Sequence, residues 1–497
     1  MLLQAATLSG LLLFSAASDL RDEFTFPAGP GVTAFFPGDP GYANASRAFN
    51  LRFTPDPVAV VYPETVEELA DIVKIGNAHR LRVSARSGGH SYIANGLGGG
   101  NHSEALVIDM GKLTKIAVDP STKTAVIETG NRLGDIALAL NEYNFAMPHG
   151  TCPYVGLGGH AAYGGYGFTS RMWGLTLDNV LSINLVLANG TITKASKDVN
   201  SELFWAMRGA GPSMAIATSI EFSVYEAPAS VIVFQYNWQL DVENAATALN
   251  TFQNFVVQPN LPPEFGAEIV LTRGAVEGNV SFGLTGAWHG DPNQLNGTVA
   301  PFLAAMPPLN AVTFTGGNWI ESVEFLAGST LNTSTAPDYT DTFYAKSLMT
   351  PQASPMNQAA RTAFMNGLAH EGFVSNMSWF FQVELYGGAN SKINSVATDD
   401  TAFVHRSSMF TIQFYASSFN NEPPYPDEGF KFLDDLVDGI TSNSPADWDY
   451  GAYTNYMEDK LEDYQTRYYG SHYDRLLALK KEIDPTGVFN FPVGIDD

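Results

Sequence analysis

The chain has 497 residues, of which 45% are hydrophobic and 15% are charged. This composition predicts a globular protein of more than one domain and excludes an intrinsically disordered chain. Acidic residues outnumber basic ones by 51 to 26, which gives a formal net charge of −25. Because such a surface repels phosphate backbones and anionic lipid headgroups, we expect neither nucleic acid nor a membrane as a partner.

The N-terminus and a set of asparagine triplets predict secretion. Residues 2–17 form an apolar run that ends in small residues, which is typical of a secretory signal peptide cleaved near Ser18. No Lys or Arg precedes the run, so a buried N-terminal helix is the alternative. Triplets that suit N-glycosylation begin at Asn44, Asn101, Asn189, Asn279, Asn296, Asn332 and Asn376. We expect residues 1–18 to be a signal peptide and the protein to be an extracellular glycoprotein.

The first half of the chain predicts mixed helices and strands. Residues 19–50 are rich in Gly and Pro and predict irregular structure. A helix is predicted within 63–81, where Thr65 and Glu68 form a capping box and Gly76 is expected to end it. Further strands are predicted at 81–86, 105–110, 115–119, 124–130 and 216–226, a hairpin with an Asn189-Gly190 turn at 181–196, and helices at 133–144 and 201–211.

A change in the pattern of residue types near residue 227 predicts a second domain. From there to residue 425, strand-like runs rich in β-branched and aromatic residues alternate with helix-like runs. The strands are predicted at 230–238, 379–388 and 409–416, and the helices at 245–256 and 356–370. This alternation favours an α+β fold in which helices cover an antiparallel sheet.

Two glycine-rich stretches, at 86–101 and 149–167, interrupt the first half. Glycine permits positive φ angles and lets backbone N–H groups approach a ligand closely, so such loops suit a pyrophosphate. Residues 156–161 with Asp178 also match the spacing of a dinucleotide fingerprint, but the preceding residues are not a plausible strand. We therefore expect two loops that wrap one phosphate-bearing cofactor rather than a Rossmann unit.

Each glycine stretch contains one nucleophilic side chain, His90 in the first and Cys152 in the second. Cys152 is the only cysteine, which excludes an internal disulfide. Imidazole and thiolate can both bond covalently to an electrophilic ring; the alternatives are an inert buried thiol and a structural histidine. No H-E-x-x-H motif and no pair of cysteines is present, so no metal site is predicted.

Four stretches together resemble the berberine-bridge-enzyme-like FAD-linked oxidases, and most closely the secreted fungal oligosaccharide oxidases among them. The stretches are "RSGGHSY" at 86–92, "GTCPYVGLGGHAAYGGYGFTSRMWGLTLDNV" at 150–180, "FWAMRGAGPSMAIATSIEF" at 204–222 and the C-terminal "YTNY…YYG…DRLLALKKEIDP…VF". The resemblance implies FAD bonded twice to the protein, at its 8α-methyl carbon by His90 and at C6 by Cys152. Other implied cofactor-binding residues are Arg86, Ser87, Gly88, Gly89, Ser91, Gly156, Gly158, Gly159, His160, Gly164, Gly165, Gly167 and Ile216.

The resemblance also implies the domain organisation. The FAD domain, of two α+β subdomains in the vanillyl-alcohol-oxidase style, would span 19–226. A substrate domain with a large antiparallel sheet and helices on one face would span 227–449. Residues 450–497 would return to the FAD domain.

The implied reaction is oxidation of the reducing-end C1 hydroxyl of an oligosaccharide to a lactone, with O2 or another acceptor reoxidising the flavin. Tyr456 would be the base, tuned by Glu384. Gln382 shares the strand face of Glu384 because strand side chains alternate. The implied sugar-binding residues are Gln382, Gln413, Tyr92 and Tyr453.

Alternatives remain open at this level. The "YTNY" run could be aromatic packing, and Glu384 could be an ion-pair partner on a strand. The substrate could be an aromatic alcohol or a secondary-metabolite intermediate, or the chain could be a flavoprotein without enzymatic activity. By resemblance, Leu177 is expected at the flavin edge where O2 attacks, and its bulk would favour another acceptor; ordinary packing is the alternative.

Overall fold

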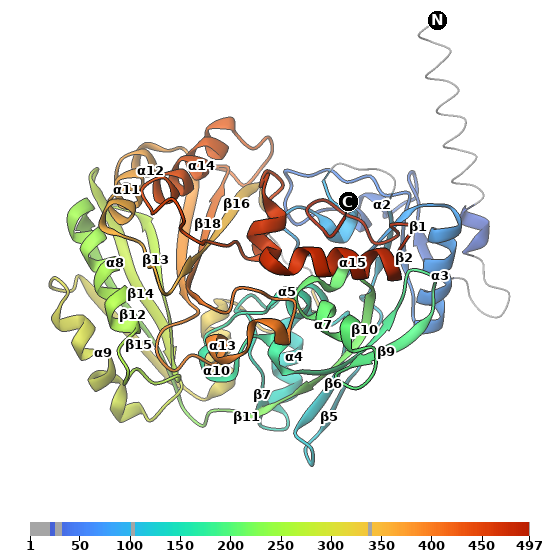
Figure 1. The fold of residues 1–497 in the computed structure, drawn as a ribbon, viewed down its shortest axis with the longest axis horizontal. Helices are drawn as coiled ribbons and strands as arrows, with labels where there is room; N and C mark the ends of the chain where they lie inside the picture. The colour runs from blue at the N-terminus through green and yellow to red at the C-terminus, as the bar shows by residue number, and fades with distance from the viewer. Residues whose placement is uncertain (1–19, 25–31, 101–104, 336–339, 497) are drawn as a thin grey trace, which may run out of the picture.

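The computed structural model describes residues 20–24, 32–100, 105–335 and 340–496. The expected signal peptide, residues 1–18, and the Asn101 triplet lie outside this part of the chain. Within it, helices surround a four-stranded, a five-stranded and a seven-stranded sheet (Figure 1). The α+β class predicted from the sequence is confirmed.

The four-stranded sheet has the order β1-β2-β4-β3 and is mostly parallel. Its strands are β1 (Thr33–Phe35), β2 (Ala59–Tyr62), β3 (Arg82–Arg86) and β4 (Ala105–Asp109). The prediction of irregular structure at 19–50 is wrong in part, because β1 pairs with β2 and a short helix, α2 (Tyr42–Ala45), follows.

Helix α3 (Val66–Ala78) packs against this sheet and begins with the predicted capping box. The Thr65 side chain accepts a hydrogen bond from Glu68 N, and Glu68 Oε2 accepts one from Thr65 N. Gly76 does not end the helix. It lies within it, where an added Cβ would be 2.5 Å from Val83 Cγ2, so this glycine allows the helix to approach the sheet.

The five-stranded sheet has the order β5-β6-β10-β8-β9 and is antiparallel. Its strands are β5 (Ile116–Asp119), β6 (Thr124–Glu128), β8 (Val180–Val186), β9 (Ile192–Ser196) and β10 (Ile216–Ser223). The neighbouring elements are α4 (Leu133–Asn141), β7 (Phe145–Ala146), α5 (Leu157–Tyr163), α6 (Ser170–Trp173), α7 (Ser201–Ala210) and β11 (Tyr225–Glu226).

All seven strands of the largest sheet are antiparallel to their neighbours, in the order β15-β12-β14-β13-β17-β18-β16. They are β12 (Val231–Asp241), β13 (Phe265–Arg273), β14 (Asn279–Trp288), β15 (Ala311–Gly317), β16 (Phe343–Pro351), β17 (Ser378–Leu385) and β18 (Ser408–Ser417). The helices of this half are α8 (Val242–Val256), α9 (Leu295–Ala304), α10 (Trp319–Ala327), α11 (Gln358–Ala369), α12 (Glu371–Val374), α13 (Lys392–Ser395) and α14 (Asp427–Thr441). In Figure 1 the sheet lies on the left, with α8, α11 and α14 on its outer face.

The largest hydrophobic core lies between this sheet and its helices. One side chain in two along each strand points into that core, which leaves the opposite face of the sheet free for polar groups. The inner face turns toward the N-terminal half of the chain and forms one wall of the cavity described below.

The C-terminal segment crosses back over the N-terminal half, where α15 (Tyr473–Ile483) contacts α7 (Figure 1). The buried Lys480 Nζ donates to the carbonyls of Ser213 at 2.8 Å and Phe489 at 3.1 Å, and it pairs with Asp484 at 2.6 Å. These bonds hold residues 480–489 against the segment that precedes β10.

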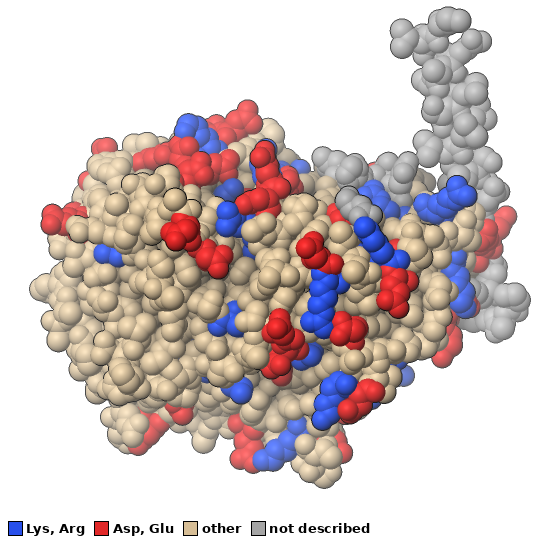
Figure 2. All heavy atoms as spheres, in the orientation of Figure 1, with Lys and Arg blue, Asp and Glu red and all other residues tan. Residues whose placement is uncertain are grey.

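The surface of the described residues fits the charge balance of the sequence. Figure 2 shows acidic side chains spread over the visible face with basic ones dispersed between them. None of the helices in the described ranges has the length and apolar character needed to cross a membrane. Of the triplet asparagines in those ranges, Asn279 is half-buried, and the exposed ones are Asn44, Asn189, Asn296, Asn332 and Asn376.

Removing a large ring from the main core should destabilise the protein. Phe282 is fully buried beside Trp238 at the centre of the seven-stranded sheet. We expect Phe282→Ala to cost about 3–5 kcal/mol through lost burial and a residual cavity, and to lower the thermal unfolding midpoint. Phe419 is 84% exposed, so Phe419→Ala should leave the midpoint unchanged. Equal midpoints for the two variants would contradict this account of the core.

Candidate active site

A cavity of about 520 Å³ lies between the glycine-rich segments of the N-terminal half and the inner face of the seven-stranded sheet. Its walls come from the loop after β3, the segment from Gly150 through α5, the strands β17 and β18, and residues 453–457. Segments that are far apart in the sequence therefore meet around one space.

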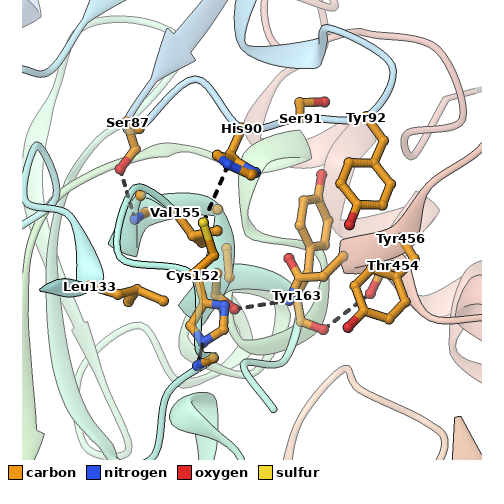
Figure 3. Close-up of a pocket in the computed structure, with 18 of the residues that line it drawn as sticks. Ser87, His90, Ser91, Tyr92, Leu133, Cys152, Val155, Tyr163, Thr454 and Tyr456 are labelled. Carbon is orange, nitrogen blue, oxygen red and sulfur yellow. Dashed lines mark hydrogen bonds between the residues drawn. The ribbon is translucent and has the colours of Figure 1, made fainter. Parts of the chain in front are cut away.

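His90 and Cys152 face one another at this cavity (Figure 3). The distance from Cys152 Sγ to His90 Nε2 is 3.6 Å. Burial, assisted by the positive charge of Arg132, lowers the pKa of His90 to about 4. The imidazole is therefore neutral at ordinary pH, and its nitrogen lone pair is available for bonding.

Two glycines allow the loops that carry these nucleophiles to touch backbone to backbone. A Cβ on Gly156 would collide with Gly88 N, and one on Gly88 would collide with Gly156 N. Ser87 Oγ reinforces the contact by accepting a hydrogen bond from Gly158 N at 3.1 Å. The second glycine stretch is not a loop throughout, because α5 begins within it with Gly156 as its N-cap.

A tyrosine and a carboxylate form the polar pair on the opposite side of the cavity. Tyr456 Oη donates a hydrogen bond to Glu384 Oε1 at 2.7 Å. Glu384 is 4% exposed, and its Oε2 has no hydrogen-bond partner among the described residues. Burial and the nearby charge of Glu268 raise the pKa of Glu384 well above its ordinary value, and burial does the same to the pKa of Tyr456.

Glu268 is a second cavity carboxylate that the sequence analysis did not identify. It lies on β13 directly opposite Glu384 on β17, and its Oε1 accepts a hydrogen bond from Gln382 Nε2 at 2.9 Å. Burial raises its pKa to about 7. The signal in the sequence was a single acidic residue among the mostly apolar residues of β13. Burying a carboxyl group costs free energy, so its presence in such a strand indicates a functional role.

Gln382 and Gln413 lie opposite one another on β17 and β18, and both line the cavity. Gln413 Nε2 donates to Tyr92 Oη at 2.7 Å. The Tyr92 ring is parallel to that of Tyr456, with 5.8 Å between centroids, as Figure 3 also shows. Amides, carboxylates and phenols thus share this wall, a combination that both donates and accepts hydrogen bonds.

Tyr453 braces the cavity wall. It is 2% exposed, and its hydroxyl accepts hydrogen bonds from Gly165 N at 2.8 Å and Asn455 Nδ2 at 2.9 Å. Its backbone N donates to Ser347 Oγ at 2.8 Å. This expected sugar-binding residue therefore connects the segment of Tyr456 to the residues after α5 through its side chain and to β16 through its backbone.

Comparison with known proteins agrees with this geometry. Residues 57–196 match the FAD binding domain family, and residues 452–496 match the berberine and berberine-like family. A chitooligosaccharide oxidase of Gibberella zeae is 34% identical, with 92% of this chain and 91% of the relative covered. A carbohydrate oxidase of Microdochium nivale is also 34% identical, with coverage of 94% and 93%.

The chain belongs to the berberine-bridge-enzyme-like FAD-linked oxidases. A xylooligosaccharide oxidase from Myceliophthora thermophila C1, solved in complex with xylobiose, superposes with a TM-score of 0.86 at 31% identity. That alignment covers 94% of this chain and 97% of the other. An Acremonium strictum glucooligosaccharide oxidase superposes with a TM-score of 0.85 at 31% identity and coverage of 94% and 96%; a further structure of it is described as carrying 6-S-cysteinyl, 8α-N1-histidyl FAD.

The residues of this FAD-linked oxidase fit its cofactor. The Tyr163 hydroxyl is buried at the cavity and has no partner among the described residues, which is typical of a group awaiting a ligand. A Cβ on Gly159 would meet nothing within 4 Å, so backbone at the start of α5 adjoins open space. The neutral His90 suits an electrophilic ring.

Most of the expected cofactor and substrate residues line the cavity, but some do so in unexpected ways. Arg86 pairs with Asp109 at 2.5 Å, and His160 Nε2 accepts a hydrogen bond from Gly150 N at 3.1 Å, so both brace the loops with their polar groups. Gly164 and Gly165 do not line the cavity. The remaining expected residues on its wall are Ser87, Gly88, Gly89, Ser91, Gly156, Gly158, Gly159, Gly167 and Ile216.

The hypothesis that Leu177 lies at the flavin edge stays a prediction. Leu177 is fully buried in an apolar cluster with Tyr166 and Tyr386, and it is not part of the cavity wall. Its backbone N donates to Gly164 O at 3.0 Å, which holds it behind that wall. Its surroundings in the structure are those of ordinary packing, the alternative that the sequence left open.

The raised pKa of Glu268 makes the stability of the protein depend on pH. The pKa of Glu268 rises from its ordinary value of 4.5 to about 7 on folding. At a pH between these two values, Glu268 is protonated in the folded protein and ionised in the unfolded chain. The stability from this carboxyl is complete below the lower pKa and is lost as pH rises through the upper one. Since Gln cannot ionise, we expect Glu268→Gln to raise the thermal unfolding midpoint at about pH 8 and leave it unchanged near pH 4.

A matched control is Glu482→Gln, because Glu482 is exposed on α15. This variant should follow the wild-type midpoint at both pH values. A gain for Glu268→Gln of equal size at both pH values would show that packing, not ionisation, separates it from wild type.

Proposed function

We propose that this FAD-linked oxidase oxidises the reducing-end C1 hydroxyl of an oligosaccharide to the lactone, which then hydrolyses to the aldonic acid. The hydrogen bond of 2.7 Å between Tyr456 Oη and Glu384 Oε1 carries the proposal, because it supports a proton-accepting pair on the wall of the cavity that His90 and Cys152 also line. When bound, FAD accepts the hydride and passes electrons to O2, which gives H2O2, or to another acceptor.

Tyr456 and Glu384 handle the hydroxyl proton. Because the pKa of Tyr456 is raised well above its ordinary value, the residue remains a phenol and cannot be a base alone. As it takes the proton of the substrate hydroxyl, it passes its own to Glu384 Oε1. The raised pKa of Glu384 makes its carboxylate a stronger proton acceptor than an exposed one. As C1 loses its hydrogen as a hydride and the hydroxyl oxygen loses its proton, the C–O bond becomes a carbonyl.

The polar groups of the wall favour a sugar over an aromatic alcohol. Gln382, Gln413 and Glu268 present amide and carboxylate atoms to the cavity, and each suits one or two ring hydroxyls. Phe325, 42% exposed at the cavity, and Phe380 offer apolar ring faces of the kind on which sugars stack. Relatives named for chito-, xylo- and gluco-oligosaccharides support the same substrate class.

We further propose that His90 and Cys152 bond FAD covalently. The neutral imidazole and the thiol lie 3.6 Å apart, and Gly88 and Gly156 hold their loops in contact. A cofactor bonded twice cannot dissociate into dilute extracellular medium. The exposed triplet asparagines suit secretion into that medium.

The first test is anaerobic bleaching of the flavin spectrum, combined with acid precipitation. We expect the yellow colour to precipitate with the chain, since covalent bonds survive unfolding. One class of cello-, chito-, malto- or xylo-oligosaccharide should bleach it. Bleaching only by coniferyl alcohol would move the substrate to aromatic alcohols, and no bleaching by any compound would favour a non-enzymatic flavoprotein. Colour left in the supernatant would contradict the covalent bonds.

The second test removes the proton acceptor. We expect Tyr456→Phe and Glu384→Gln to lower kcat by about 10²–10⁴-fold, because general base catalysis contributes about that much. The wild-type kcat should rise with pH through the raised pKa of Glu384, which needs its carboxylate form, and this rise should vanish in Glu384→Gln.

Tyr464→Phe is the matched control for this test. Its hydroxyl also donates to a carboxylate, Asp496 Oδ1 at 2.8 Å, but the pair is not part of the cavity wall. This variant should keep the wild-type kcat and pH profile. A Tyr456→Phe enzyme with the same kcat as Tyr464→Phe would remove Tyr456 from the mechanism.

A further inference from the structure

Residues 49–52, here called the clasp, touch three parts of the molecule that meet at the cavity. Phe49 stacks on His90, Asn50 bonds to the loop of Tyr92 and to β16, and Arg52 pairs with Asp459. None of these contacts is used in the mechanism above. The clasp lies between α2 and β2, and its first two residues belong to the stretch 19–50 that the sequence predicted to be irregular.

Phe49 covers one face of the His90 imidazole. The ring centroids are 3.8 Å apart and the planes differ by 27°, so the two rings are stacked. The edge of Phe343, 5.7 Å away, packs against Phe49 at 64°. An imidazole held by its face cannot rotate freely about its side-chain bonds, so its ring edge keeps one direction, toward Cys152.

Asn50 holds Phe49 in place. It is fully buried, and its Nδ2 donates to Tyr92 O at 2.8 Å and to Phe343 O at 2.9 Å. Its Oδ1 accepts from Phe343 N and from Arg52 N, both at 3.1 Å. Two donors and two lone pairs are the full capacity of an amide, so this side chain links the His90 loop to β16 with no bond left unmade.

Arg52 fixes the other end of the clasp. Its NH1 and NH2 pair with the two oxygens of Asp459 at 3.0 and 2.6 Å, and its Nε donates to Phe343 O at 3.2 Å. A bidentate pair restricts both partners in distance and in angle. Asp459 follows Tyr456 by three residues, so the clasp is tied to the segment that carries the proposed base.

We propose that Phe49 is a positioning residue for covalent attachment of FAD at His90, and that Asn50 and Arg52 keep it there. The inference rests on the proposed covalent cofactor. In this step a C–N bond replaces one C–H of the 8α-methyl group and the imidazole N–H, so two protons and two electrons are released. The isoalloxazine ring takes the electrons, and molecular oxygen accepts them from the ring and forms H2O2.

The neutral state of His90 agrees with this role. Burial and Arg132 keep its pKa near 4, so a lone pair is present and only its direction must be set. Phe49 supplies that direction through contact with the ring face alone, since a phenyl group offers no hydrogen bond. A ring at position 49 is therefore required, while a hydroxyl on that ring is not.

The test follows flavin attachment by peptide mass in the full-length protein, harvested at intervals after induction. In Phe49→Ala and Phe49→Leu, the His90 peptide should acquire flavin about 3- to 10-fold more slowly than in wild type, which corresponds to the loss of one ring–ring contact. The Cys152 peptide of the same samples should keep its wild-type rate. Phe49→Tyr keeps the ring and should restore the His90 rate.

Phe314→Leu is the matched control, because Phe314 also contacts an aromatic ring, that of Tyr236, but is 48% exposed and is not part of the cavity wall. It should leave attachment at His90 unchanged. A wild-type His90 rate in Phe49→Ala, an equal loss at His90 and Cys152, or a loss in Phe314→Leu of the same size would each overturn the inference. Wild-type protein without flavin on His90 would instead contradict the proposed function.

Discussion

The backbone contact between Gly88 and Gly156 is the constraint on which the rest of the site depends. Any side chain at either position would push the loop after β3 away from the start of α5. With the loops in contact, His90 and Cys152 lie within 3.6 Å of each other, although 62 residues separate them in the chain. Two nucleophiles held this close can act on a single ligand, and glycine is the residue that permits it.

The seven-stranded sheet provides the second half of the site because its two faces have different partners. Its outer face packs against helices in the largest core, and its inner face carries Gln382, Glu384, Glu268 and Gln413 toward the cavity. Buried carboxylates are unfavourable unless they are protonated or paired. The pKa values of Glu384 and Glu268 are raised for this reason, and the ionised form of Glu384 therefore binds a proton more tightly than an exposed carboxylate does.

Neither half would be aligned without the segments that cross between them. Tyr453 connects Gly165, which follows α5, to β16, and the clasp connects the His90 loop to β16 through Asn50. Buried hydrogen bonds of this kind are directional, so they set the angle between the two halves as well as their separation. The site is therefore the product of contacts at its border as much as of the residues within it.

The sequence by itself determined the fold class, most helices and strands, and the residue types of the site. Glycine spacing, the lone cysteine and strand alternation in 382–384 are local patterns, which can be recognised without knowledge of the fold. Only the tertiary structure decided that Glu268 faces Glu384, that Leu177 lies behind the cavity wall, and that Gly76 lies within a helix. Those outcomes depend on strand register and on packing between distant segments, and no short stretch of sequence contains both partners of such a contact.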